Sequence, residues 1–83
     1  MSYRYSLADS ALKVFSACAT ADRDRLIRLF ETIARAPEFE ADVDGLRIEG
    51  RECMVKCSAD WVVTYWLDFP IREVRIVALD RAP

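Results

Sequence analysis

Any chemistry in this sequence must come from carboxylate, lysine, arginine, tyrosine or hydroxyl side chains, because its 83 residues include no histidine. A nucleophile of the Ser–His or Cys–His kind is therefore excluded, and no side chain titrates near neutral pH by default. Glu49, Glu52 and Asp68 are the carboxylates that a small acid–base enzyme would use. They are scattered along the chain, so surface charge explains them better than paired acid–base catalysis does.

The three cysteines, Cys18, Cys53 and Cys57, lack the paired close spacings of a zinc or redox motif. If Cys53 and Cys57 share one strand, their Cα atoms are separated by about 13 Å, which is too far for a disulfide. A thiolate metal site would need Cys18 and a fourth ligand from a chain without histidine. We therefore expect small buried thiols, no bound metal and no cofactor.

Residues 38–50 form an acidic stretch without hydrophobic periodicity. This stretch contains five carboxylates and two glycines: Glu38, Glu40, Asp42, Asp44, Glu49, Gly45 and Gly50. A calcium loop would need a denser spacing of oxygen ligands ending in a bidentate glutamate, and residues 42–45 match only a fragment of that pattern. The stretch therefore predicts a solvated surface crossover rather than a ligand site.

Length and charge restrict the class of protein. A chain of 83 residues fits one domain, residues 1–83, which buries about 60% of its unfolded surface. The formal net charge of −2 argues against a nucleic-acid binder, whose usual footprint is a basic surface. No apolar run approaches the roughly 20 residues of a membrane span, so we expect no membrane partner. Arg4, Asp9 and Lys13 interrupt any signal-peptide core, which predicts a cytoplasmic protein.

Three β-type runs, residues 51–58, 61–69 and 73–80, occupy the C-terminal third of the chain. Two residues separate the first two runs, and three residues separate the second from the third. Links this short connect antiparallel neighbours, so the runs predict a three-stranded antiparallel meander.

Period-two alternation predicts which side chains of the meander share a face. On the first strand, Met54 and Lys56 lie on the face opposite Cys53. On the middle strand, one face is predicted to carry Trp61, Val63, Tyr65 and Leu67. The other face is predicted to carry Trp66. On the last strand, Val74, Ile76 and Ala78 are predicted to face the core. The arginines Arg72, Arg75 and Arg81 remain for solvent or a partner.

Upstream of the meander, the pattern predicts one short strand and two helices. Residues 3–5 alternate like a strand, whereas apolar residues recur every three or four positions over residues 7–18 and again over residues 21–35. The short link between the helices makes them an antiparallel pair.

Local signals mark the ends of these helices. Ser6 and Asp9 have the spacing of a capping box at the start of the first helix, and Leu12 belongs to its predicted apolar stripe. Thr20 is the expected N-cap of the second helix, and Pro37 is expected to end it.

Together these elements predict an α+β fold: a short N-terminal strand, a two-helix hairpin and then a three-stranded antiparallel meander. The N-terminal strand is expected to pair with the last strand, which makes a four-stranded sheet with the helices packed on one face.

The order and spacing of these segments resemble the RelE/ParE superfamily of type II toxin–antitoxin toxins over nearly the whole chain. The resemblance is carried best by Leu12-Lys13 with Phe15, residues 29–37, residues 61–65 (Trp-Val-Val-Thr-Tyr) and residues 74–77 (Val-Arg-Ile-Val). It implies one toxin-like domain over residues 1–83. RelE-like members cut messenger RNA in the ribosomal decoding site, ParE-like members poison DNA gyrase, and a cognate antitoxin protein neutralises both kinds.

The resemblance also implies where RNA cleavage would occur. In RelE-like nucleases, basic residues of the middle and last strands bind the scissile phosphate, so Lys56 and Arg81 are the candidate catalytic residues. The sequence departs from the pattern at Val62, where an arginine is expected, and it ends at Pro83, before the tail that brings a catalytic tyrosine or histidine. Phosphodiester transfer needs proton transfer as well as charge stabilisation, so we expect cleavage to be weak or absent.

Two classes of function remain open. The first is a toxin-like protein, an mRNA endoribonuclease if active, whose partners are an antitoxin and either the ribosome with its mRNA or gyrase. The second is a non-catalytic binding module derived from a toxin, which inhibits gyrase, forms a homodimer or pairs with another protein. The side chains expected to contact RNA or a protein partner are Arg51, Arg72, Arg75 and Trp66.

Overall fold

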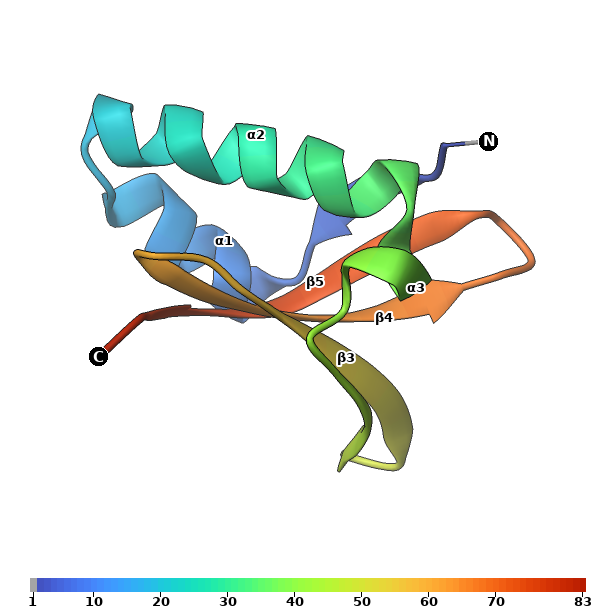
Figure 1. Cartoon of the computed structure of the whole chain (residues 1–83). Helices are drawn as coiled ribbons and strands as arrows, with labels where there is room; N and C mark the ends of the chain where they lie inside the picture. Colours follow the sequence, from blue (N-terminus) through green and yellow to red (C-terminus); the bar gives the residue numbers. More distant parts are fainter. Residues whose placement is uncertain (1) are drawn as a thin grey trace.

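The computed structural model of this chain describes residues 2–83, which form five strands and three helices. In chain order these are β1 (Arg4–Leu7), α1 (Asp9–Ala17), α2 (Thr20–Arg35), α3 (Pro37–Glu40), β2 (Val43–Ile48), β3 (Arg51–Cys57), β4 (Trp61–Asp68) and β5 (Glu73–Arg81). The long helix α2 lies across one face of the sheet (Figure 1). Within residues 2–83, no helix is both long enough and apolar enough to cross a membrane.

All five strands belong to one sheet, in the order β1-β5-β4-β3-β2. The pairs β3–β4 and β4–β5 are antiparallel, which confirms the predicted meander. β1 pairs with β5, as predicted, and the two strands run parallel. The sheet therefore has one strand more than the four predicted, and the additional strand is the edge strand β2.

The prediction of a loop over residues 38–50 is wrong, because α3 and β2 lie within this stretch. β2 pairs antiparallel with β3 through a two-residue turn at Glu49 and Gly50, whose φ angles of 49° and 79° are both left-handed. A bulge between Val43 and Leu46 interrupts the alternation, and all six residues of β2 are exposed. An exposed, bulged edge strand shows no regular alternation of apolar and polar residues. The acidic stretch therefore gave no sequence signal for β2.

The helix ends differ from the predicted caps. The N-cap residues are Ala8 and Ala19, and neither helix has a side-chain cap, so the predicted capping by Ser6 and by Thr20 is wrong. Ser6 is part of β1, and its hydroxyl donates a 2.8 Å hydrogen bond to the Glu73 carboxylate on the neighbouring strand β5. The end of α2 at Arg35, before the proline, agrees with the prediction.

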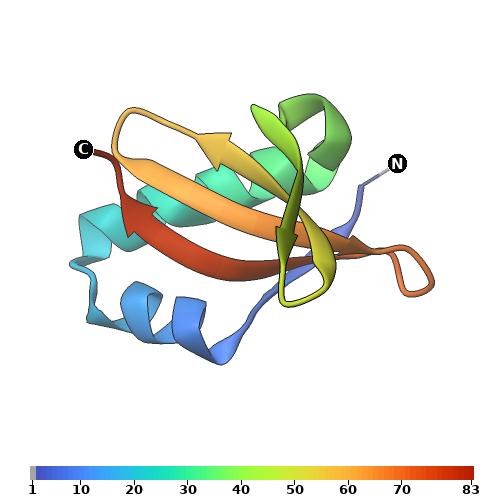
Figure 2. The ribbon, with the colours of Figure 1, turned by 90° about the horizontal axis from the view of Figure 1, so that it is seen from below.

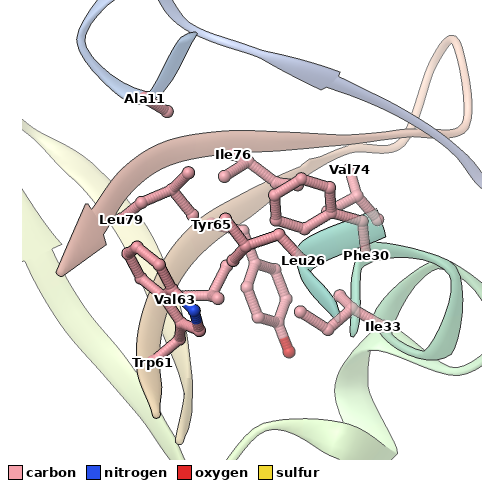
Figure 3. Close-up of a cluster of buried hydrophobic side chains, with 10 residues drawn as sticks. All are labelled: Ala11, Leu26, Phe30, Ile33, Trp61, Val63, Tyr65, Val74, Ile76 and Leu79. Carbon is pink, nitrogen blue, oxygen red and sulfur yellow. The ribbon is translucent and has the colours of Figure 1, made fainter. Parts of the chain in front are cut away.

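The core lies between α2 and the sheet, as Figure 3 shows. Ten residues form it: Ala11, Leu26, Phe30, Ile33, Trp61, Val63, Tyr65, Val74, Ile76 and Leu79. The predicted faces of β4 are confirmed, because Val63 and Tyr65 are fully buried and Leu67 packs against the cluster. The predicted burial of Leu12 is wrong, since α1 turns it outward and leaves it 47% exposed.

A bulge in β5 changes which of its side chains face the core. Thr64 pairs with Ala78 but Tyr65 pairs with Ile76, so Val77 is an extra residue. Because side chains alternate, one extra residue reverses the face of every position beyond it. Leu79 therefore occupies the core position predicted for Ala78, and Arg81 lies on the face that carries the helices.

Candidate functional site

Lys56 lies on the helix-covered face of the sheet, because its ladder partner is the core residue Val63. Its Nζ atom is 3.1 Å from Oε1 of Glu40 and 3.9 Å from Oδ2 of Asp42. The hydrogen bond from Lys56 to Glu40 raises the pKa of the ammonium group, and both carboxylates add to the effect. One ammonium between two carboxylates has a net charge of −1, which repels rather than attracts a phosphate.

Asp42 is held in this position by a second contact. The backbone N–H of Cys57 donates a 2.7 Å hydrogen bond to Oδ2 of Asp42, and the Asp42 N–H donates to the carbonyl of Val55. The segment that joins α3 to β2 is thereby fixed beside the end of β3. The carboxylate next to Lys56 is consequently part of the fold rather than a mobile side chain.

Arg81, the second candidate catalytic residue, is engaged by α2. Its Nη2 atom donates a 2.9 Å hydrogen bond to Oδ2 of Asp22, and its guanidinium lies 4.4 Å from the centre of the Trp61 ring. This hydrogen bond lowers the pKa of Asp22 and raises that of Arg81, so both groups are charged at neutral pH. The pair has no net charge, which reduces the attraction that Arg81 offers an anion.

In the described part of the chain, the opposite face of the sheet has no helix across it, and we call it the open face. From the strand registers, its central residues are Cys53, Val55, Val62, Thr64, Trp66 and Ala78. Figure 2 views the sheet from this side, with α2 behind the strands. Cys53 and Thr64 are buried there, whereas Val55, Val62, Trp66 and Ala78 are half-buried and make the accessible centre of this face apolar. The arginine expected at Val62 would have stood among them.

Arg51 belongs to the open face, and its guanidinium lies 3.9 Å from the centre of the Trp66 ring. Arg51 and the pair Lys56 and Arg81 are therefore on opposite faces of the sheet. The structure does not bring these three basic residues together into one phosphate-binding surface.

Arg72 and Arg75 are also engaged within the chain. Arg72 has a left-handed φ of 53° in the β4–β5 turn and lies 4.9 Å from the centre of the Tyr3 ring. Arg75 projects from β5 beside Trp66, and its Nη1 atom donates a 2.9 Å hydrogen bond to the Ser6 hydroxyl. Each arginine predicted to contact a partner is thus held by an aromatic ring or a hydroxyl group of its own chain.

The shifted pKa values of the remaining groups lie further from neutral pH than the ordinary values of those groups. Burial raises the pKa of the Tyr65 phenol, and the nearby carboxylates of Glu40 and Asp42 raise it further. The Tyr65 hydroxyl donates a 2.6 Å hydrogen bond to the carbonyl of Pro37, which occupies its proton. Burial also raises the pKa of the Cys53 thiol. None of these groups is suited to transfer a proton at neutral pH.

The sequence pattern did not indicate that the acidic residues Asp22, Glu40 and Asp42 would be the partners of the basic candidates. Their side chains come from α2 and from the segment around α3, far from β3 and β5 along the chain. The apolar open face could have been recognised from the alternation that places Val55 and Val62 opposite Lys56. Within residues 2–83, no group of three or more histidine, cysteine or acidic residues has the geometry of a metal site.

No family model and no curated protein sequence matches this chain. Its fold is similar to three solved structures of toxin–antitoxin complexes. The RelBE2 complex from Mycobacterium tuberculosis matches with a TM-score of 0.83 and 16% identity, over 99% of this chain and 100% of that chain. The archaeal RelE–RelB complex from Pyrococcus horikoshii matches with a TM-score of 0.73 and 18% identity, over 98% of this chain and 96% of that chain.

The intact RelBE complex of E. coli matches with a TM-score of 0.68 and 16% identity, over 98% of each chain. At identities this low the likeness establishes the arrangement of helices and strands, and it extends from one end of the chain to the other. This chain therefore has the RelE toxin fold.

Proposed function

We propose that this chain is the toxin-like component of a type II toxin–antitoxin system and that a cognate antitoxin binds it in the cytoplasm. The observation that carries the proposal is the end-to-end match to structures solved as toxin–antitoxin complexes, with a TM-score of up to 0.83. These matches cover 98–99% of this chain.

Ribosome-dependent cleavage of mRNA is expected to be weak or absent in this protein. Lys56 is enclosed by two carboxylates and Arg81 is paired with Asp22, so neither offers a free positive charge to a scissile phosphate. Burial also raises the pKa values of Cys53 and Tyr65, which makes these two groups poorer proton-transfer groups at neutral pH. If cleavage occurs, Lys56 and Arg81 remain the residues that would stabilise the developing phosphate charge.

Expression of the chain alone in a bacterial host tests the proposal. Growth arrest that is relieved by co-expression of a neighbouring reading frame, whose product co-purifies with the chain, is the expected result. Unaffected growth together with no co-purifying product would contradict it. Primer extension on mRNA from arrested cells then reports whether ribosome-dependent cleavage accompanies the arrest.

A second candidate function is a non-catalytic binding module, and the apolar open face favours it. Val55, Val62 and Trp66 line this face, and such a surface suits a protein interface better than a nucleic acid. The module would form a homodimer, inhibit gyrase or bind another protein. Mass measurement in solution and a supercoiling assay with gyrase distinguish these cases, and a monomer that cleaves mRNA on ribosomes would exclude all of them.

A further inference from the structure

A cleft opens where the two hairpins of the sheet separate. The ladder between β3 and β4 ends at the pair Met54–Tyr65, whereas β3 continues alongside β2 to Arg51 and β4 continues alongside β5 to Asp68. Figure 1 shows β3 curving away from β4 at this point. A cavity of about 600 Å³ lies at the fork, within the size range of about 300–1,000 Å³ that is typical of ligand pockets.

Apolar and aromatic side chains form about half of the lining of this cleft. These residues are Met54, Trp66, Leu67, Phe69 and Pro70. Phe69 is 57% exposed. Arg51 lies 3.9 Å from the Trp66 ring centre and supports it from one side, so this wall is held in place without a ligand. Large aromatic side chains in a preformed hollow are the usual anchor points of a protein interface.

The backbone at the fork also has unused hydrogen-bonding capacity. Arg51 and Glu52 of β3 have ladder partners only on β2, and Leu67 and Asp68 of β4 have ladder partners only on β5. Their opposite edges face the cleft. Backbone groups on such an edge can bind an extended peptide, and they offer less to a compact small molecule.

The charged residues around the cleft indicate which kind of side chain can bind in it. Three carboxylates line it, those of Glu38, Glu52 and Asp68, together with one cation, Arg51. In residues 2–83 none of the three carboxylates takes part in a hydrogen bond or an ion pair with another side chain, whereas Arg51 is stacked on Trp66. The net charge of −2 around an apolar hollow repels a phosphate and attracts a basic side chain.

We propose that this cleft binds a lysine or arginine side chain that projects from an apolar, extended segment of the antitoxin. The inference rests on the proposed function, since it names the antitoxin as the partner, and it adds the surface and the type of residue that this partner uses. The aromatic walls hold the apolar neighbours of the basic residue, and the three carboxylates bind its charge. The segment that docks here is therefore cationic and apolar rather than acidic.

The test measures binding of the neighbouring-frame product that relieves growth arrest, by calorimetry with the purified full-length chain. The variant combines Glu38→Gln, Glu52→Gln and Asp68→Asn, which removes the charges and keeps the side-chain volumes. We expect at least a tenfold loss of affinity at low salt and a smaller difference at high salt, because salt screens these charges. The matched control combines Asp24→Asn, Glu31→Gln and Asp60→Asn and should bind within about twofold of the unmodified chain, because these residues do not line the cleft.

A second variant, Phe69→Ala, removes part of the apolar wall without changing charge and should also weaken binding at least tenfold. Circular dichroism shows whether the triple variant folds. If it does not fold, the affinity of Phe69→Ala is the test. Tight binding by the unmodified chain that is unchanged in the triple variant and in Phe69→Ala would overturn the cleft proposal and leave the proposed function intact. Failure of the unmodified chain to bind the product would overturn both. Displacement of the product by a short polyadenylate RNA that binds in the cleft would also overturn the inference.

Discussion

Lys56 and Glu40 form the closest ion pair around the predicted catalytic lysine, with 3.1 Å between Nζ and Oε1 and each side chain only 22% exposed. Glu40 ends the short helix α3, and Lys56 is near the end of β3, so the pair ties the covering segment to the sheet. The lysine that a nuclease would direct at a phosphate is here part of the structural framework.

Removal of the two carboxylates beside Lys56 should increase RNA binding. The change Glu40→Gln with Asp42→Asn converts a local net charge of −1 into +1, because only the lysine remains charged. Fluorescence anisotropy with a short single-stranded RNA at low salt should show tighter binding by the double variant than by the unmodified chain. Lys56→Ala in the same background should remove the gain. Equal binding by the double variant and the unmodified chain would show that the carboxylates do not mask Lys56.

Burial of the Tyr65 phenol should give the free energy of unfolding a measurable dependence on alkaline pH. The pKa of Tyr65 is raised by burial, so the folded state keeps a proton that the unfolded state loses near pH 10. The unfolded state then binds fewer protons than the folded state, and the free energy of unfolding falls as the pH rises above about 10. The raised pKa of Lys56 acts in the same direction.

Tyr65→Phe checks this prediction. The loss of the hydroxyl leaves the Pro37 carbonyl without its partner and should cost about 1–3 kcal/mol at neutral pH. Urea unfolding at about pH 8 and about pH 11 should show a smaller fall in stability for the variant than for the unmodified chain. Equal falls would mean that ionisation of Tyr65 is not linked to unfolding.

Phe30 should be among the residues on which folding depends most. It lies on α2, is 1% exposed, and packs against the rings of Tyr5 and Phe15 with centroid distances of 5.4 and 6.1 Å. Phe30→Ala should cost about 3–5 kcal/mol, because it removes buried apolar surface and leaves a cavity. Phe39→Ala is the matched control: Phe39 is 85% exposed, and the change should alter stability by less than about 0.5 kcal/mol in urea unfolding. Similar losses of stability in the two variants would contradict the position of Phe30 in the core.

The β2–β3 turn should depend on Gly50, whose φ of 79° is costly for any residue with a Cβ atom. Gly50→Ala should destabilise the hairpin by about 1–2 kcal/mol, although no atom lies within 4 Å of the added Cβ, because the penalty comes from the backbone conformation. Amide hydrogen exchange of β2 should accelerate. The control Glu49→Asn places a residue that tolerates left-handed φ in the same turn and should leave the exchange unchanged or slower. Unchanged exchange in Gly50→Ala would argue against the hairpin.

The sequence by itself determined the meander, because links of two and three residues leave adjacent runs no arrangement other than antiparallel pairing. It also determined the buried face of β4, where Val63 and Tyr65 alternate with residues of the open face, and the end of α2 before Pro37. These features depend on interactions between residues close together in the chain. The pairing of β1 with β5 was also predicted and is confirmed, whereas its parallel direction came from the structure alone.

Only the tertiary structure determined on which face of the sheet each candidate residue lies and which charges surround it. The bulge at Val77 moved Arg81 to the helix-covered face, and the pairing of β1 with β5 directed Ser6 to Glu73 instead of to a helix cap. The carboxylates of Asp22 and Glu40 reach Arg81 and Lys56 from segments distant in sequence. Strand register and bulges are set by the packing of the whole sheet, so a local pattern can identify a basic residue but cannot show which charges will surround it.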